Sequence, residues 1–145
     1  MTHPNTYGRE LALQYLYMYD LLSGVDVQPL NDYLSMQDPA PKAEALGLTR
    51  TLVDAVLQHL DELDQEIAAS AHNWSLRRMA IVDRNILRLG LAELIACPES
   101  PYPVIINEAV DLARRYSSEA ACGFVNGLLD KIRLKYRAQE VVIET

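Results

Sequence analysis

The sequence predicts an all-α protein of about seven helices, forming one domain over residues 1–145 with two small helical halves at about 1–73 and 74–145. Three observations support this. Apolar side chains recur at helical spacing through most of the chain, no segment shows the alternation of a half-buried strand, and leucines far outnumber the six glycines. Half of the 145 residues are hydrophobic, so the chain can bury a core of useful size.

The first half is predicted to hold three helices. One covers residues 7–22, with Thr6 as its N-cap and Gly24 just beyond its end; it is apolar on nearly all sides, which indicates either deep burial or cover by a partner. Three prolines between residues 25 and 42 leave room for a short helix at about 30–36. Residues 44–69 alternate an apolar and an acidic face, which predicts one long amphipathic helix.

Asp83 interrupts the apolar stripe of the next segment. In an unbroken helix it would lie on the core face, where an unpaired carboxylate is costly. We therefore expect either a break before Asp83, whose carboxylate then caps the following helix, or an ion pair with Arg77, Arg78 or Arg88. The break is the favoured alternative, and it gives a short helix followed by a longer one to about residue 96.

Two further helices complete the second half. Prolines at positions 98, 101 and 103 end the preceding helix, residues 106–116 form the next, and Ser118 can cap a last helix that runs to about residue 137. In this last helix Gly123 and Gly127 predict the close approach of a neighbouring helix. Cys122 has no histidine near it in sequence, so core packing is a better interpretation than a nucleophile.

The net charge of −7 argues against a protein that binds nucleic acid or an anionic membrane by charge alone. Basic residues nevertheless gather in the second half: residues 1–76 carry eleven acidic and three basic side chains, and residues 77–137 carry seven and ten. Six arginines there either bind phosphate or pair with carboxylates on a solvated face, and composition favours pairing. They are Arg77, Arg78, Arg84, Arg88, Arg114 and Arg115.

Cysteine and histidine usage predicts neither a metal site nor a cofactor. The two cysteines form no CxxC pair, and the three histidines lie apart without a set of carboxylates around them. No leader pattern or apolar run of membrane-spanning length is present, so we expect a cytoplasmic protein with reduced thiols and no membrane association.

An ordered series of motifs in the second half, and one in the first, resembles the NusB family of transcription antitermination factors. The motifs are Trp74-Ser-Leu-Arg-Arg-Met-Ala-Ile-Val-Asp-Arg-Asn-Ile-Leu-Arg88, Ala92-Glu-Leu94, Pro103-Val-Ile-Ile-Asn-Glu-Ala-Val-Asp-Leu-Ala113, Phe124-Val-Asn-Gly-Leu-Leu-Asp130 and Arg9-Glu-Leu-Ala-Leu-Gln-Tyr-Leu-Tyr17. The resemblance spans nearly the whole chain, and residues 31–46 are the least similar part.

The resemblance implies a NusB-like helical bundle and no enzymatic activity. It implies an antitermination and elongation adaptor that binds boxA RNA of ribosomal RNA transcripts together with the NusE ribosomal protein, in the RNA polymerase antitermination complex. By position, the implied RNA-binding residues are Arg9, Gln14, Tyr17, Arg88 and Phe124. The implied partner-binding residues are Tyr17, Asp83 and Arg88.

One departure from the family concerns RNA affinity. Members usually carry several arginines just before the first helix, whereas this chain has Asn5-Thr-Tyr-Gly8 followed by Arg9 alone. Fewer phosphate contacts predict weak binding of RNA by the isolated protein, with a shallow salt dependence. The alternative function is therefore a NusB-fold protein-interaction module that has lost RNA binding. We expect Arg9 to be exposed and of little weight for stability, and Tyr17 to lie on a contact surface rather than in the core.

Overall fold

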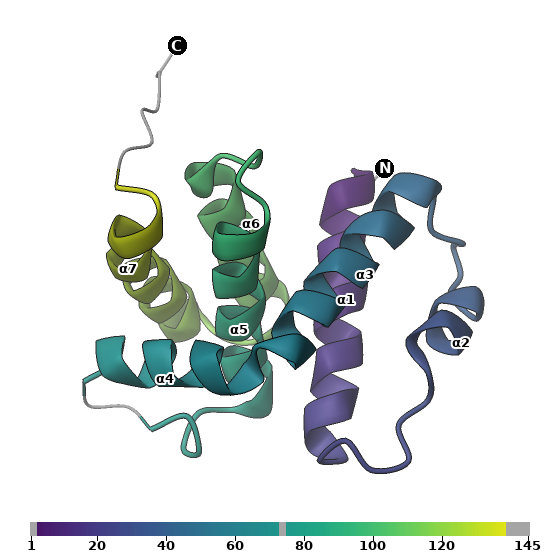
Figure 1. Cartoon of the computed structure of the whole chain (residues 1–145), viewed down its shortest axis with the longest axis horizontal. Coiled ribbons are helices and arrows are strands. Elements are labelled where there is room, and N and C mark those ends of the chain that lie inside the picture. Colours follow the sequence, from purple (N-terminus) through teal and green to yellow (C-terminus); the bar gives the residue numbers. More distant parts are fainter. Residues whose placement is uncertain (1–2, 73–74, 139–145) are drawn as a thin grey trace.

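The computed structural model describes residues 3–72 and 75–138, which form seven α-helices and no β-strand, as Figure 1 shows. The all-α prediction is confirmed. Trp74 and the expected boundary between the two halves lie outside the described residues. The helices are α1 (Pro4–Leu21), α2 (Leu30–Ser35), α3 (Ala43–Gln58), α4 (Leu60–Ser70), α5 (Ile81–Ala96), α6 (Tyr102–Tyr116) and α7 (Glu119–Tyr136).

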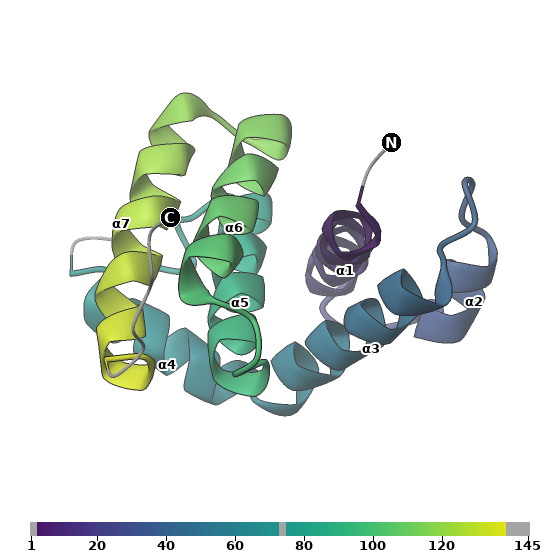
Figure 2. The same cartoon turned by 90° about the horizontal axis from the view of Figure 1, so that it is seen from above.

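The helices form two groups that lie side by side. Helices α1, α2 and α3 make up one group, and α4 to α7 the other (Figures 1 and 2). Helix α4 packs against α5 and α7, while α1 and α3 pack against each other and both contact α5. The two groups therefore share one core along α5. No described helix is long and apolar enough to cross a membrane.

Helix α5 occupies the centre of that core. All ten residues from Asn85 to Leu94 are buried, and the helix packs against α1, α3, α4, α6 and α7. Fully buried side chains on its neighbours include Leu52 of α3 and Leu129 of α7. Burying an aliphatic side chain of this size contributes about 1.5–3 kcal/mol to stability, so this packing fixes where the functional side chains lie.

The crossing of α1 and α3 depends on a small residue. A Cβ atom at Gly8 would lie 2.9 Å from the carbonyl oxygen of Ala45, closer than real Cβ contacts allow. At the same crossing the Thr49 hydroxyl lies 2.9 Å from the Gly8 carbonyl oxygen and 2.8 Å from that of Ala45. Gly8 thus lets the two backbones meet, and Thr49 supplies a buried donor between them.

The prediction of one helix over residues 44–69 is wrong. The chain breaks at His59, whose backbone leaves the helical region (φ −123°, ψ 28°), and α3 and α4 run in different directions on either side (Figure 1). The break lets α4 turn across α5 and α7 and bury Leu63 and Ile67 there. Tertiary packing has overridden a continuous local pattern, because neither glycine nor proline marks this position.

Two predicted helix starts also need correction. Helix α1 begins at Pro4, where the fixed φ of proline suits the first turn, and His3 caps it by accepting a hydrogen bond from the Asn5 N–H at 3.1 Å. Thr6 is not the cap; its hydroxyl donates to Glu108 at 2.8 Å. The short helix expected before Asp83 is a turn instead, and α5 begins at residue 81.

Other predicted elements are confirmed. The short helix near residues 30–36 is α2, and α6 ends at Tyr116, although it begins four residues earlier than its apolar pattern indicates. Ser118 caps α7 by accepting a hydrogen bond from the Ala121 N–H at 3.1 Å. The close helix contact expected at Gly123 and Gly127 is wrong, because both are exposed and a Cβ atom there would meet nothing within 4 Å.

Candidate partner and RNA interface

Arg9 is not an exposed cation, and that expectation is wrong. Its guanidinium donates to both carboxylate oxygens of Glu93 on α5, at 2.8 and 2.6 Å, and its Nη1 atom lies 3.4 Å from Glu108. The Arg9 and Glu93 side chains are only 6% and 2% exposed. Arg9 therefore joins α1 to α5 and α6, and it offers no free charge to a phosphate in this conformation.

Arg88 is likewise buried and paired. It donates to Asp64 on α4 at 2.7 and 2.8 Å and to Asp20 on α1 at 2.9 Å. Asp20 also accepts two hydrogen bonds from Arg84, at 2.6 and 2.7 Å, and one from Asn85 at 2.9 Å. The Arg88 charge thus serves to hold α1, α4 and α5 together, and its implied contact with RNA or a partner stays a prediction.

Sequence reasoning did not single out Asp20, the carboxylate on which this network converges. Burial alone would raise the pKa of Asp20, but the hydrogen bonds from Arg84 and Asn85, together with the nearby charges of Arg88 and Arg84, hold that pKa below its ordinary value. A signal for it exists in the sequence: like Asp83, Asp20 is a carboxylate that interrupts an apolar stretch, here residues 15–22.

Gln14 and Tyr17 lie on a partly open face of α1. The Gln14 side chain donates to the Tyr116 hydroxyl at 3.1 Å and accepts from the Tyr33 hydroxyl at 2.8 Å, so it links α1 to α6 and α2. Tyr17 and Tyr116 are each 40% exposed. The exposure of Tyr17 agrees with the expectation of a contact surface, because an exposed tyrosine presents an apolar ring and a polar tip to a partner.

Asp83 and Phe124 lie together in a hollow between the start of α5 and the start of α7. This hollow of about 200 Å³ is also lined by Arg78, Ser118 and Ala121. The break before Asp83 is confirmed, but within the described residues Asp83 neither caps α5 nor pairs with an arginine. Its Oδ1 atom is buried and accepts no hydrogen bond from a described residue, so the fold leaves one buried acceptor unsatisfied beside this hollow.

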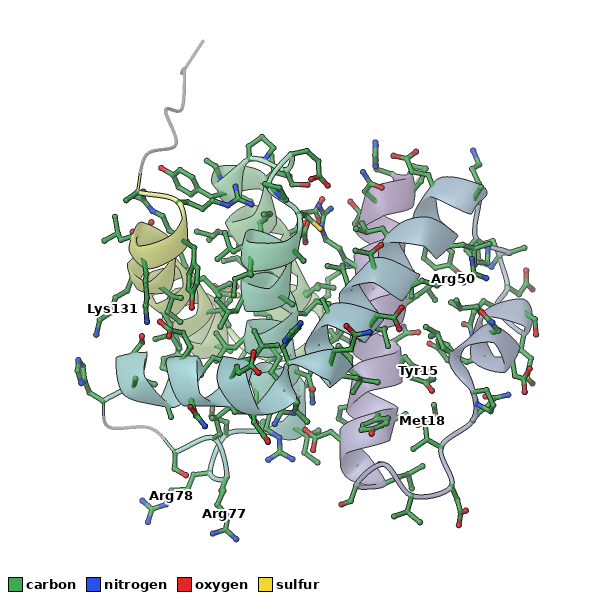
Figure 3. All side chains as sticks on the ribbon, viewed as in Figure 1. Tyr15, Met18, Arg50, Arg77, Arg78 and Lys131 are labelled. Carbon is green, nitrogen blue, oxygen red and sulfur yellow. The ribbon has the colours of Figure 1, made fainter. Side chains whose placement is uncertain are left out.

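The six arginines singled out in the sequence, Arg77, Arg78, Arg84, Arg88, Arg114 and Arg115, divide into two classes. Four pair with carboxylates, as the composition favours: Arg84 and Arg88 with Asp20, Arg114 with Asp111, and Arg115 with Glu10. Arg77 and Arg78 are exposed and form no ion pair within residues 3–72 and 75–138. Their side chains point away from the body of the protein, from the turn between α4 and α5 (Figure 3).

A separate groove of about 640 Å³ lies between α3, α4 and α5, and its chemistry is unsuited to RNA. Its floor is apolar and includes Leu63 and Ile95, and its rim carries the carboxylates of Asp54, Glu62 and Glu66. Phosphate groups would be repelled by such a rim. This groove therefore forms no part of the candidate interface.

The cysteines have the character of core residues. Burial, reinforced by the charges of Glu93 and Glu99, raises the pKa of the Cys97 thiol to about 11, so the thiol stays protonated and weakly nucleophilic at neutral pH. Cys122 is also buried, and its thiol lies 3.6 Å from the Val110 carbonyl oxygen. Within the described part of the chain, no three histidine, cysteine or carboxylate side chains gather as a possible ligand set for a metal ion.

Comparison with known proteins decides the family. The family profile described as "NusB family" matches residues 7–133. The transcription antitermination protein NusB of Myxococcus xanthus (strain DK1622) is 42% identical over 127 residues, which cover 86% of this chain and 91% of that protein. The chain belongs to the NusB family.

Solved structures agree with this membership of the NusB family. A structure of T. maritima NusB matches with a TM-score of 0.80 and 29% identity, over 94% of each chain. A chain from the crystal structure of antitermination factors NusB and NusE in complex with dsRNA matches with the same TM-score and identity, over 94% of this chain and all of that one. The NusB-like helical bundle expected from the motifs is therefore confirmed.

Proposed function

We propose that this NusB family member is a transcription antitermination adaptor that binds boxA RNA of ribosomal RNA transcripts jointly with the NusE ribosomal protein, in the RNA polymerase antitermination complex. The observation that carries the proposal is the likeness, over nearly the whole chain, to a structure of the antitermination factors NusB and NusE in complex with dsRNA. The proposal includes no catalytic step and no cofactor. The proposed site residues are Gln14, Tyr17, Asp83 and Phe124.

Joint binding explains how an acidic chain takes part in RNA recognition. The protein has a net charge of −7, and the two cations first expected to meet RNA, Arg9 and Arg88, are neutralised inside the fold. Affinity for RNA depends chiefly on cations that meet phosphates. A basic partner can hold the backbone while Tyr17 and Phe124 contribute aromatic rings on which bases stack.

The second candidate function is a protein-interaction module that has lost RNA binding. The observation in its favour is the burial of Arg9 and Arg88, whose charges are already paired with carboxylates inside the fold. Both candidates use Tyr17 and the hollow at Asp83 toward a protein partner. They differ in whether this chain increases the affinity of that partner for RNA, and the titration of boxA RNA with the NusE protein, in the presence and absence of this chain, separates them.

Tyr17→Ala is expected to weaken the complex of this protein with NusE and boxA RNA about tenfold or more. Removing a ring that stacks on a base or fills a partner's pocket costs about 1–3 kcal/mol. The melting temperature should stay near that of the wild type, because Tyr17 is exposed. Fluorescence anisotropy of labelled RNA measures the affinity.

Tyr136→Ala is the matched control, because Tyr136 has the same 40% exposure and lies at the end of α7. This control should bind like the wild type. Equal affinities of the Tyr17 and Tyr136 variants would remove Tyr17 from the interface.

A further inference from the structure

We infer that Arg77, Arg78 and Lys131 form a phosphate-binding surface for a single-stranded segment of RNA that passes over Phe124. This inference rests on the proposed RNA-binding function and assigns the source of its phosphate contacts. It places them on the turn before α5 and on α7, instead of before α1 where the family's arginine run stands.

The guanidinium groups of Arg77 and Arg78 differ from those of the other arginines because they have no ion-pair or hydrogen-bond partner among the described residues. Every other arginine of the described chain donates to a described carboxylate, amide or backbone oxygen. Arg77 and Arg78 are adjacent, exposed and without such a partner for their side chains among the described residues, and Figure 3 shows both extending into solvent. Two neighbouring cations without a carboxylate are available to phosphates.

Lys131 supplies a third cation on α7. Its ammonium group donates to the Ser70 carbonyl oxygen at 3.1 Å and lies 2.8 Å from Nε2 of His72. These contacts join α7 to the end of α4, yet they do not neutralise the ammonium charge, because neither partner is a carboxylate. Lys131 is exposed, and Figure 3 shows its side chain on the outer side of α7.

Phe124 lies between the arginines and the lysine. It lines the hollow that contains Arg78 and Asp83, and it also lines a second hollow of about 370 Å³ with His72 and Lys131. Gly123 and Gly127, which meet no neighbouring helix, keep that second hollow open. Phe124 and Lys131 are seven residues apart on α7, which is two turns and about 10 Å along one face.

Cations on both sides of an aromatic ring are the arrangement that single-stranded nucleic acid requires. A base can stack on the ring while the phosphates on either side meet the cations. Asp83 also lines the hollow beside Phe124, and its carboxylate can accept a hydrogen bond from the exocyclic amino group of a base. The surface therefore combines backbone contacts with one acceptor for a base edge.

The test measures the affinity of the complex with the NusE protein for fluorescein-labelled boxA RNA, across a series of KCl concentrations. It compares the wild type with the double variant Arg77→Ala/Arg78→Ala. The matched control is Lys42→Ala/Arg50→Ala, which removes two exposed cations from the start and the exposed face of α3 and changes the net charge equally. Circular dichroism melting checks that both variants fold.

The inference predicts that the slope of log K against log salt becomes shallower by about 1.4 in the Arg77/Arg78 variant, because each lost phosphate contact to a single strand removes about 0.7. Affinity at low salt should fall about tenfold, whereas the control should stay within about twofold of the wild type. In Lys131→Ala the slope should become shallower by about half as much. The charge-conserving double variant Arg77→Lys/Arg78→Lys should keep the slope of the wild type.

Three results would overturn the inference. Equal slopes for the wild type and the Arg77/Arg78 variant would remove this surface from the RNA path and leave the proposed function standing. Equal losses in the variant and the control would show an effect of net charge alone. If the wild-type complex itself gains no RNA affinity from this protein, the proposed function fails together with the inference.

Discussion

Arg9→Ala is expected to lower the free energy of unfolding by about 3–5 kcal/mol, which is the usual cost of removing one partner from a buried ion pair. The substitution would leave the carboxylate of Glu93, which is 1% exposed, without its two charged hydrogen bonds. For a domain of this size the melting temperature should fall by roughly 6–20 °C. Urea unfolding and thermal melting both measure the change.

The double variant Arg9→Met/Glu93→Leu is the informative companion. Replacing both members of a buried pair by apolar side chains of similar volume is often neutral, so it should recover most of the loss. Arg50→Ala, at an exposed arginine, should melt like the wild type. If Arg9→Ala melts within about 2 °C of the wild type, the ion pair does not hold α1 against α5 as described. Any loss of RNA binding by Arg9→Ala must be corrected for the fraction of this variant that is unfolded.

Asp20→Ala is expected to cost roughly 3 kcal/mol, because it removes the acceptor shared by Arg84, Asn85 and Arg88. The side chains of Asp20 and Arg84 retain 16% and 18% exposure, so water compensates in part. Arg88 keeps its ion pair with Asp64. The expected loss is therefore smaller than at Arg9, and chemical unfolding at neutral pH measures it.

The contribution of Asp20 should depend on pH with a definite sign. Burial raises the pKa of Asp20, but the bonds and charges of Arg84, Asn85 and Arg88 outweigh it and leave the folded-state pKa below the unfolded value near 4. The stabilisation is therefore fully present above about pH 4 and is lost as the pH falls through the folded-state pKa. The stability difference between the wild type and Asp20→Asn should shrink below pH 4. A difference that stays constant from pH 7 to pH 3 would contradict the assignment.

The helices were largely predictable because their signals are local. Apolar periodicity and the prolines located α2, α5, α7 and the end of α6 closely, and the hydroxyl of Ser118 marked a real cap. The break at His59 has no local marker, because it arises from the packing of α4 against α5 and α7. Sequence patterns describe what a segment can form, and tertiary contacts decide where it stops.

The candidate site was less predictable, because charge pairing depends on residues far apart in sequence. Arg9 meets Glu93 at a separation of 84 residues, and Arg88 meets Asp20 at 68, so neither pairing is visible in local spacing. The exposure of Tyr17 was correctly expected from its amphipathic side chain. That Arg77 and Arg78 lack ion-pair partners could not be predicted, because it depends on which carboxylates the other arginines bind.

The central claim, that this protein and NusE recognise RNA jointly, is tested most directly by titrating labelled boxA RNA with the NusE protein alone, with this protein alone, and with both. The account predicts weak binding by this protein alone with a shallow salt dependence, and binding by the pair at least about tenfold tighter than by NusE. If this protein binds NusE but adds nothing to its RNA affinity at low salt, the adaptor function is contradicted and the protein-interaction module is the correct account.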